Sequence, residues 1–144
     1  MIQSDKSKFK TPLLTVRIVT PEGIVWQGLA QFVILPCKDG EMGILRGHVA
    51  ITAMIDVGVL KVRSNNEVLS FCIQTGFAQV EADEIIVLVN QAELGNNINP
   101  EQAQNTLELA MTNSDQALNK LEKFQAKTAL KVAKARLKAA QGVG

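Results

Sequence analysis

The sequence is poor in the side chains from which catalytic and metal centres are usually built. Among 144 residues it has one histidine, His48, two cysteines, one tryptophan and no tyrosine. Cys37 and Cys72 form no CxxC pair, and no histidines accompany them at the spacing of zinc ligands. A zinc-finger type of site is therefore excluded, and we expect two buried free thiols in a reducing compartment rather than a disulfide.

Long hydrophobic runs are also missing. The best stretch, "EIIVLV" at 84–89, is far shorter than the roughly 20 residues that a membrane-spanning helix needs. The polar start "MIQSDKSKFK" is followed by no apolar segment, so it is not a secretory signal. We interpret residues 1–11 as a flexible lead-in.

Charge is unevenly distributed along a chain whose formal net charge is only +1. Residues 1–99 hold 8 Lys and Arg against 10 Asp and Glu, whereas residues 100–144 hold 7 against 4. All seven basic residues of the second segment follow Asp115. Such a basic block indicates an acidic partner or a solvated face.

Residues 12–95 have the pattern of a β-domain. In "LLTVRIV" the residues Leu14, Val16 and Ile18 alternate with the opposite face, as in a half-buried strand. Turn signals recur about every eight to twelve residues, which is typical of a sandwich or a barrel. They lie at "PEG" 21–23, Pro36, "SNN" 64–66 and Ala82–Asp83. The run "IIVLV" at 85–89 lacks alternation, so we expect both of its faces to be covered.

The pattern becomes helical in residues 96–144. Asn99 can cap a first helix that begins with Pro100. Its apolar face comprises Ala103, Leu107, Ala110 and Met111. We expect "TNSD" to interrupt the run, with Ser114 or Asp115 capping a second helix to about Gln141, where glycines follow. A hairpin of about 45 residues has little core of its own, so it must pack on the β-domain or on another protein.

Four ionisable residues, Asp39, Glu41, Arg46 and His48, fall within the ten residues of "DGEMGILRGH", 39–48, and Cys37 lies just before them. Cys37, Asp39 and His48 could make a nucleophilic triad, and Asp39, Glu41 and His48 a metal site. No helix start is near to activate the thiol, and there is no second histidine. The glycines at 40, 43 and 47 favour a shaped binding loop instead.

Three ordered segments carry a resemblance to a known family. They are "VTPEG" 19–23, "GEMGILRGH" 40–48 and "IDVGVL" 55–60, followed by "GFAQVEADEIIVLVNQAE" and the helical hairpin. Over about residues 12–141 the chain resembles the epsilon subunit of F-type ATP synthases, called delta in mitochondria. The resemblance implies a β-sandwich of about ten strands followed by a C-terminal α-helical hairpin.

The resemblance also implies a function. The subunit would be a non-catalytic rotor subunit, without cofactor or metal, that couples gamma to the c ring, and its hairpin would restrain ATP hydrolysis. In a bacterium it would lie peripherally on the cytoplasmic face of the inner membrane. Docking to the rotor is expected to use Glu41, Leu45, Arg46 and His48. Many members have proline where this chain has Arg46, which implies a less rigid and more basic loop.

The hairpin departs from one motif of the family and carries a charged stripe. Some bacterial members bind ATP with I/L-D-x-x-R-A, but this chain has Asn99 and Gln102 in place of the acid and the arginine, so nucleotide binding is not expected. Basic residues recur along the second helix, and the resemblance offers an acidic segment of the catalytic beta subunits as their partner. We expect inhibition, rather than folding, to depend on Lys127, Lys131, Lys134 and Arg136.

Two alternatives remain open from the residues alone. One is a free-standing binding module whose basic helix engages an acidic partner or nucleic acid. The segment after Asp115 has a single aromatic residue, Phe124, and little arginine, which disfavours nucleic acid. The other is the small cysteine hydrolase considered above.

Overall fold

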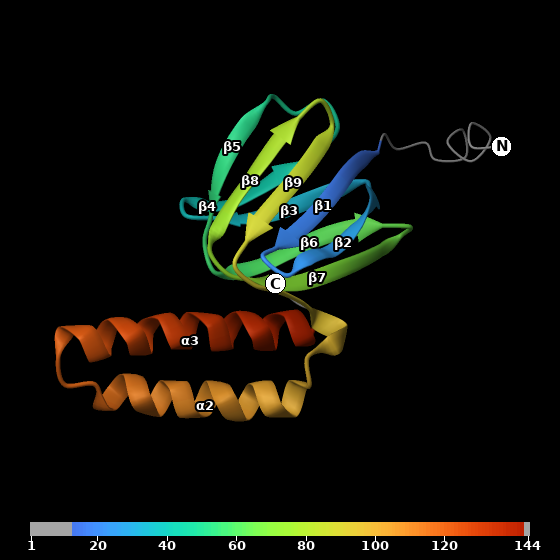
Figure 1. The fold of residues 1–144 in the computed structure, drawn as a ribbon. Helices are drawn as coiled ribbons and strands as arrows, with labels where there is room; N and C mark the ends of the chain where they lie inside the picture. Colours follow the sequence, from blue (N-terminus) through green and yellow to red (C-terminus); the bar gives the residue numbers. More distant parts are fainter. Residues whose placement is uncertain (1–12, 143–144) are drawn as a thin grey trace.

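The computed structural model describes residues 13–142, which form ten strands and a helical hairpin (Figure 1). The expected lead-in, residues 1–11, lies outside the described part. The strands are β1 Leu14–Thr20, β2 Gly23–Ala30, β3 Phe32–Cys37, β4 Gly40–Ile44, β5 Ile51–Ile55, β6 Gly58–Ser64, β7 Glu67–Ile73, β8 Gly76–Glu81, β9 Glu84–Val89 and β10 Ala92–Leu94. A 3-10 turn, η1 Gly95–Asn97, leads to α2 Pro100–Gln116 and α3 Lys120–Ala140. The predicted sandwich followed by a hairpin is confirmed.

The strands form one sheet that folds over on itself. Its order is β10-β7-β6-β3-β5-β8-β9-β1-β2, and β4 pairs with β3 outside this path. Neighbours are antiparallel except β1 and β9, which pair in parallel from Thr15 opposite Glu84 to Val19 opposite Leu88. The sheet bends back on itself between β3 and β5. These two strands share a single residue pair, Cys37 with Ile55. Two packed layers result.

The core lies between these layers and follows from the alternation of the strands. Leu14, Val16 and Ile18 of β1 are fully buried, as their spacing predicts. Other large side chains with less than 2% exposure include Leu35, Ile44, Ile55, Leu60, Phe71, Ile73 and Ile85. Both predicted tight turns are present, and each has two residues with positive φ, Asn65–Asn66 and Ala82–Asp83. Two consecutive residues with positive φ are the mark of hairpin turns that match the twist of the strands.

The strands that are covered on both faces are β6 and β7, not β9 as we predicted. A second buried cluster lies on their outer surface and comprises Val59, Cys72, Ile98, Ala103, Ala135 and Ala139. In β9 burial alternates, and Leu88 is 37% exposed. The unbroken run of apolar residues in β9 therefore does not mean that the chain itself covers both faces.

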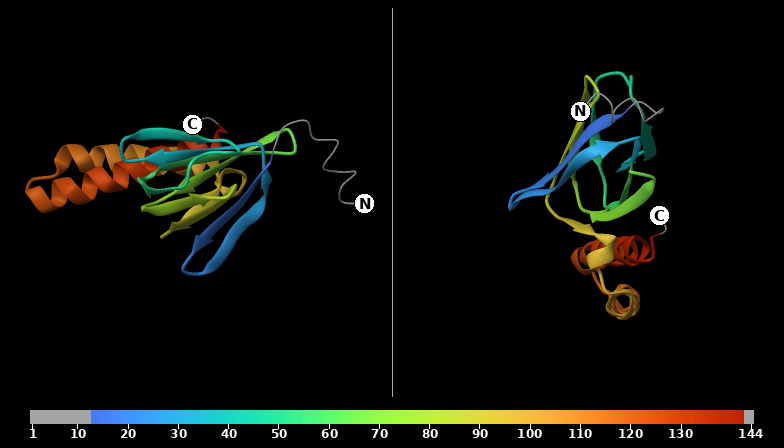
Figure 2. Two further views of the ribbon diagram at one scale, coloured as in Figure 1. Left: turned by 90° about the horizontal axis from the view of Figure 1, so that it is seen from above. Right: turned by 90° about the vertical axis from the view of Figure 1, so that its right-hand side faces the viewer.

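The hairpin lies against β6 and β7 mainly through α3. In the side view of Figure 2, α3 is the helix next to the strands, and α2 lies on its far side. Asn99 caps α2 as predicted, because its Oδ1 accepts hydrogen bonds from the backbone N–H groups of Glu101 and Gln102. The expected break at Ser114 or Asp115 is wrong, since α2 continues to Gln116.

Asn119 is the cap of α3, and its partner is Glu122. Asn119 Oδ1 accepts from the backbone N–H of Glu122 at 2.8 Å, and Asn119 Nδ2 donates to the Glu122 carboxylate at 2.7 Å. This pairing resembles a capping box, in which residues three apart satisfy each other's groups at a helix start. The signal is in the sequence as "NKLE", but "TNSD" offered a competing cap.

Gly95 of η1 lies in close contact with the backbone at the end of α3. A Cβ added there would overlap the carbonyl oxygen of Ala139 and lie 3.1 Å from that of Ser70. We expect Gly95→Ala to push the end of α3 off the sandwich, at a cost of ~1–3 kcal/mol as in other overpacked sites. Hydrogen exchange of the α3 amides should become faster while the core strands stay protected.

Gly43→Ala is the matched control for this substitution. A Cβ at Gly43 meets nothing within 4 Å, and its φ is not positive. If Gly95→Ala and Gly43→Ala leave the exchange of α3 equally unchanged, the close approach at Gly95 does not determine docking.

Candidate functional site

The segment "DGEMGILRGH" is not one loop. It comprises the end of a turn, the whole of strand β4 and the start of the loop that follows. Lys38–Asp39 form the turn into β4, and residues 45–50 form the loop after it. Five strand residues at about 3.4 Å each separate these ends by about 17 Å. Glu41 therefore lies near the turn, whereas Leu45, Arg46 and His48 lie at the opposite end of β4.

Neither chemical centre that we considered at this segment is assembled. Cys37 lies beside the turn, while His48 follows the far end of β4. Burial, and then the nearby Asp39 carboxylate, raise the pKa of the Cys37 thiol, which is the opposite of what a nucleophile needs. Within residues 13–142 no three His, Cys, Asp or Glu side chains are grouped as metal ligands. His48 instead has its Nδ1 2.8 Å from the carbonyl oxygen of Val49.

The loop at 45–50 is fastened to the β8–β9 turn by one carboxylate. Arg46 Nε donates to Asp83 Oδ2 at 3.1 Å, and the backbone N–H of Gly47 donates to Asp83 Oδ1 at 2.7 Å. Leu45 and Val49 are left 60% and 71% exposed. Arg46 thus tethers a loop that we expected to be less rigid.

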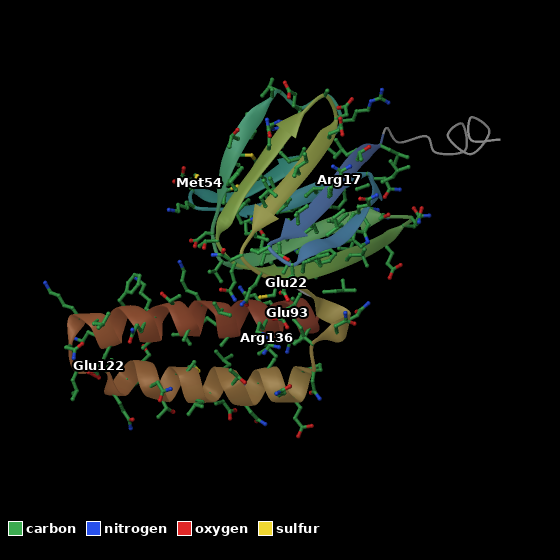
Figure 3. All side chains as sticks on the ribbon, in the orientation of Figure 1. Arg17, Glu22, Met54, Glu93, Glu122 and Arg136 are labelled. Carbon is green, nitrogen blue, oxygen red and sulfur yellow. The ribbon has the colours of Figure 1, made fainter. Side chains whose placement is uncertain are left out.

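A row of exposed apolar side chains crosses the layer of the sandwich that is formed by β5, β8, β9 and β1. In the strand register Met54 of β5 lies opposite Phe77 of β8, Phe77 opposite Leu88 of β9, and Leu88 opposite Val19 of β1. Met54, Phe77 and Leu88 are 57%, 42% and 37% exposed. They line a hollow of about 560 Å³ that also includes Lys38 and Thr75. Met54 is labelled in Figure 3, at the β5 edge of this layer.

The sequence contained a signal for this row that we misread. The non-alternating run at 85–89 did indicate that the outward-facing residues of β9 are suited to burial. We expected both faces of this run to be covered, but within residues 13–142 Leu88 is left 37% exposed. A row of large apolar side chains on a sheet surface is typical of a protein–protein interface.

Two ion pairs join α3 to the sandwich. Lys131 Nζ lies 3.1 Å from Asp56 Oδ2, in the connection between β5 and β6. Arg136 forms two hydrogen bonds with the Glu93 carboxylate of β10, at 2.9 and 3.2 Å. Figure 3 shows Glu93 and Arg136 next to each other at the junction of the strands with the helices. The two-pronged geometry favours arginine over lysine at this position.

These pairs divide the basic residues that we expected to act together. Lys131 and Arg136 contact the sandwich, whereas Lys127 and Lys134 form no ion pair with residues 13–142. Docking of the hairpin therefore involves contacts of two of the four. That inhibition, rather than folding, depends on these residues stays a prediction. The Glu93 carboxylate, as the hydrogen-bond partner of Arg136, raises the pKa of that guanidinium.

The free end of the hairpin is apolar as well as basic. Leu118, Leu121 and Phe124 are 86%, 65% and 69% exposed. Asn99, in contrast, directs its side-chain oxygen to the helix backbone, where it serves as a cap. Positions 99 and 102, which hold asparagine and glutamine, therefore present no charged side chain.

Comparisons with known proteins identify the family of the chain. Residues 13–95 match the family model "ATP synthase, Delta/Epsilon chain, beta-sandwich domain". The chain is 44% identical to the ATP synthase epsilon chain of Trichodesmium erythraeum over 133 residues, covering 90% of this chain and 97% of that one. It is 39% identical to the chloroplastic epsilon chain of Coffea arabica, covering 90% and 98%.

The chain belongs to the ATP synthase epsilon chain family. The family prediction is thereby confirmed, and with it a role as an ATP synthase subunit rather than as a cysteine hydrolase or a free-standing module. None of the helices in residues 13–142 has the length and apolar character to cross a membrane.

Solved structures support the fold of the epsilon chain. A chain of the Euglena gracilis mitochondrial ATP synthase, in a structure of OSCP, F1 and c-ring, superposes with a TM-score of 0.79 at 23% identity, covering 92% of this chain and 84% of that chain. A chain of the Tetrahymena thermophila central stalk and c-ring structure gives 0.63 at 17%, covering 91% and 98%.

Acid should weaken the contact between Asp56 and α3. The hydrogen bond from Lys131 lowers the pKa of the Asp56 carboxyl, so its contribution is present at neutral pH and is lost as the pH falls below about 4. For a partly exposed pair we expect ~0.5–1 kcal/mol. Asp56→Asn should reduce the protection of α3 from hydrogen exchange at pH 7, and the difference from the unmodified chain should vanish in acid.

Asp83→Asn serves as the comparison variant, because Asp83 binds Arg46 on a different part of the sandwich. It should leave the exchange of α3 unchanged. An equal effect of both variants would show that net charge, not the Lys131 contact, controls α3.

Proposed function

We propose that this epsilon chain is a non-catalytic rotor subunit that couples gamma to the c ring. The observation that carries the proposal is the exposed row of Met54, Phe77 and Leu88, which crosses adjacent strands and lies in a shallow hollow. A sheet surface of this kind is stabilised by burial against a partner. Gamma is the partner we assign to it.

The loop at 45–50 is the surface that we assign to the c ring. It exposes Leu45 and Val49, and its backbone is held by Asp83. Arg46 and His48 would add polar contacts at its rim. Because Glu41 lies at the other end of β4, it belongs to neither of these surfaces in our proposal and is instead close to α3. The subunit would be peripheral to the membrane through the complex, on the cytoplasmic side if the chain is bacterial.

The hairpin would regulate the enzyme rather than couple it. Its exposed basic residues, including Lys127 and Lys134, and its apolar free end fit an acidic surface with apolar pockets. The acidic segment of the catalytic beta subunits is the expected surface. Electrostatic complementarity of this kind accelerates encounter and is weakened by salt.

Loss of the apolar row should prevent assembly. We expect Phe77→Ser combined with Leu88→Ser to weaken co-purification with gamma by at least about tenfold, because two central anchors at ~1 kcal/mol or more each would be lost. The sandwich should still fold, since both side chains point away from its core. Pull-down of gamma by the tagged chain measures the effect.

Val68→Ser is a matched control, because Val68 is 44% exposed but lies on β7, away from the row. It should leave co-purification intact. Retention of gamma by the Phe77 and Leu88 variant would show that the row is not the interface.

The basic residues without a partner in the sandwich should matter for hydrolysis. Replacing Lys127 and Lys134 by alanine should raise ATP hydrolysis of the assembled enzyme about two- to fivefold at low salt, equivalent to ~0.4–1 kcal/mol. The thermal midpoint of the free chain should barely change. Replacing Lys131 and Arg136 should instead lower that midpoint, because both contact the sandwich.

Equal hydrolysis by the unmodified and Lys127/Lys134-substituted enzymes across a salt series would contradict the regulatory part of the proposal. It would leave these two residues as a solvated face.

A further inference from the structure

The loop at 45–50 begins with a closed β-turn. The backbone N–H of His48 donates to the carbonyl oxygen of Leu45 at 3.1 Å, which closes a turn over residues 45–48. Gly47 occupies the third position of this 45–48 turn with a φ of +88°. A positive φ at that position is typical of a type II turn and favours glycine there. The internal hydrogen bond uses the N–H of His48, so the N–H of Gly47 needs another partner.

Asp83 supplies that partner and holds both central residues of the turn. Its Oδ1 accepts from the Gly47 N–H at 2.7 Å, and its Oδ2 accepts from Arg46 Nε at 3.1 Å. Hydrogen bonds to an ionised carboxylate are stronger than those between neutral groups. Because the Arg46 side chain is largely exposed, its ion pair contributes little, and the backbone bond to Gly47 is the stronger part of the tether.

The Asp83 carboxylate is itself fixed in place by the β8–β9 turn. Asp83 has a φ of +62°, a left-handed conformation that aspartate tolerates better than most residues. Its carbonyl oxygen accepts a hydrogen bond from the backbone N–H of Thr15 at 2.9 Å. One residue therefore connects the start of β1, the β8–β9 turn and the 45–48 turn.

Two exposed apolar side chains flank the turn that Asp83 holds. Leu45 is its first residue, and Val49 directly follows its last. His48 Nδ1 lies 2.8 Å from the Val49 carbonyl oxygen, so the chain is also constrained just after the turn. A loop that is already ordered loses less conformational entropy when a partner covers it. The order of the 45–48 turn therefore contributes to the affinity with which Leu45 and Val49 can be bound.

We propose that Asp83 is a positioning residue for docking to the rotor. It holds the 45–48 turn in the conformation that presents Leu45 and Val49 to the c ring, and this inference rests on the docking role proposed above for the loop. Asp83 acts through Arg46 and Gly47 rather than by touching the partner. Substitutions at Asp83 should therefore alter affinity while leaving the apolar docking side chains in place.

The test is a graded pair of substitutions, Asp83→Asn and Asp83→Gly, in the full chain. Asparagine keeps an oxygen for the Gly47 N–H but loses the ion pair, whereas glycine removes both contacts and suits a φ of +62°. NMR relaxation of the free chain should show motion at residues 45–50 that increases from Asp to Asn to Gly.

Affinity should follow the same order as this motion. The dissociation constant of the chain for a gamma–c-ring rotor that lacks epsilon should rise about two- to threefold in Asp83→Asn and about five- to tenfold in Asp83→Gly. The thermal midpoint should not fall in this order, because glycine relieves the positive φ. A purely structural role would lower the midpoint and the affinity together, and that result would overturn the proposal.

Glu84→Gln is the matched control, because it removes the same charge from the neighbouring residue. Glu84 takes part in none of the ion pairs of residues 13–142, so the variant should change neither the motion of the loop nor the affinity.

Leu45→Ser combined with Val49→Ser tests the docking surface itself. Normal rotor binding by this double variant would refute both the loop as a docking surface and the positioning role. Loss of binding there, together with unchanged affinity of Asp83→Gly, would refute the positioning role alone.

Discussion

The contact of α3 with the outer surface of β6 and β7 is the constraint on which the arrangement of the molecule depends. Val59 and Cys72 point away from the sandwich core, and Ala135 and Ala139 cover them. Burial, more than the nearby Glu93 carboxylate, raises the pKa of Cys72 to about 12, which keeps this thiol uncharged and inert. Without α3 these strands would expose apolar side chains on a second face. Without the strands the hairpin would have almost no core.

The helix and the strands approach closely in this contact, but the side chains that the helix contributes are small. The helix contributes alanines, each of which removes little apolar area from water, and the ion pairs at Asp56 and Glu93 are partly exposed. Small side chains allow close approach, as at Gly95 and Ala139, while giving modest stabilisation. Such an interface fixes one geometry with modest stabilisation.

Much of the fold could be predicted because the strands alternate and their turns have characteristic residues. Leu14, Val16 and Ile18, the turn at Asn65–Asn66 and the cap at Asn99 all depend on short-range rules. The second cap was missed because Ser114, Asp115 and Asn119 are all suitable, and the local signal that favours Asn119 is Glu122, three residues later. The apolar row was missed for a different reason. The run at 85–89 signals only the part of the row that Leu88 supplies. Met54, Phe77 and Leu88 come from three strands, and their adjacency is a property of register that no single segment contains.

The parallel pairing of β1 with β9 has a consequence for synthesis on the ribosome. About seventy residues separate the two strands in the sequence, so β1 can pair with β2 early but must wait for β9 before its other edge is filled. Contacts of such high sequence separation delay folding. Until residue 89 has left the exit tunnel, Leu14, Val16 and Ile18 lack their final partners, and a nascent chain at that stage would need protection from aggregation. The hairpin, synthesised last, meets a sheet that has only just closed.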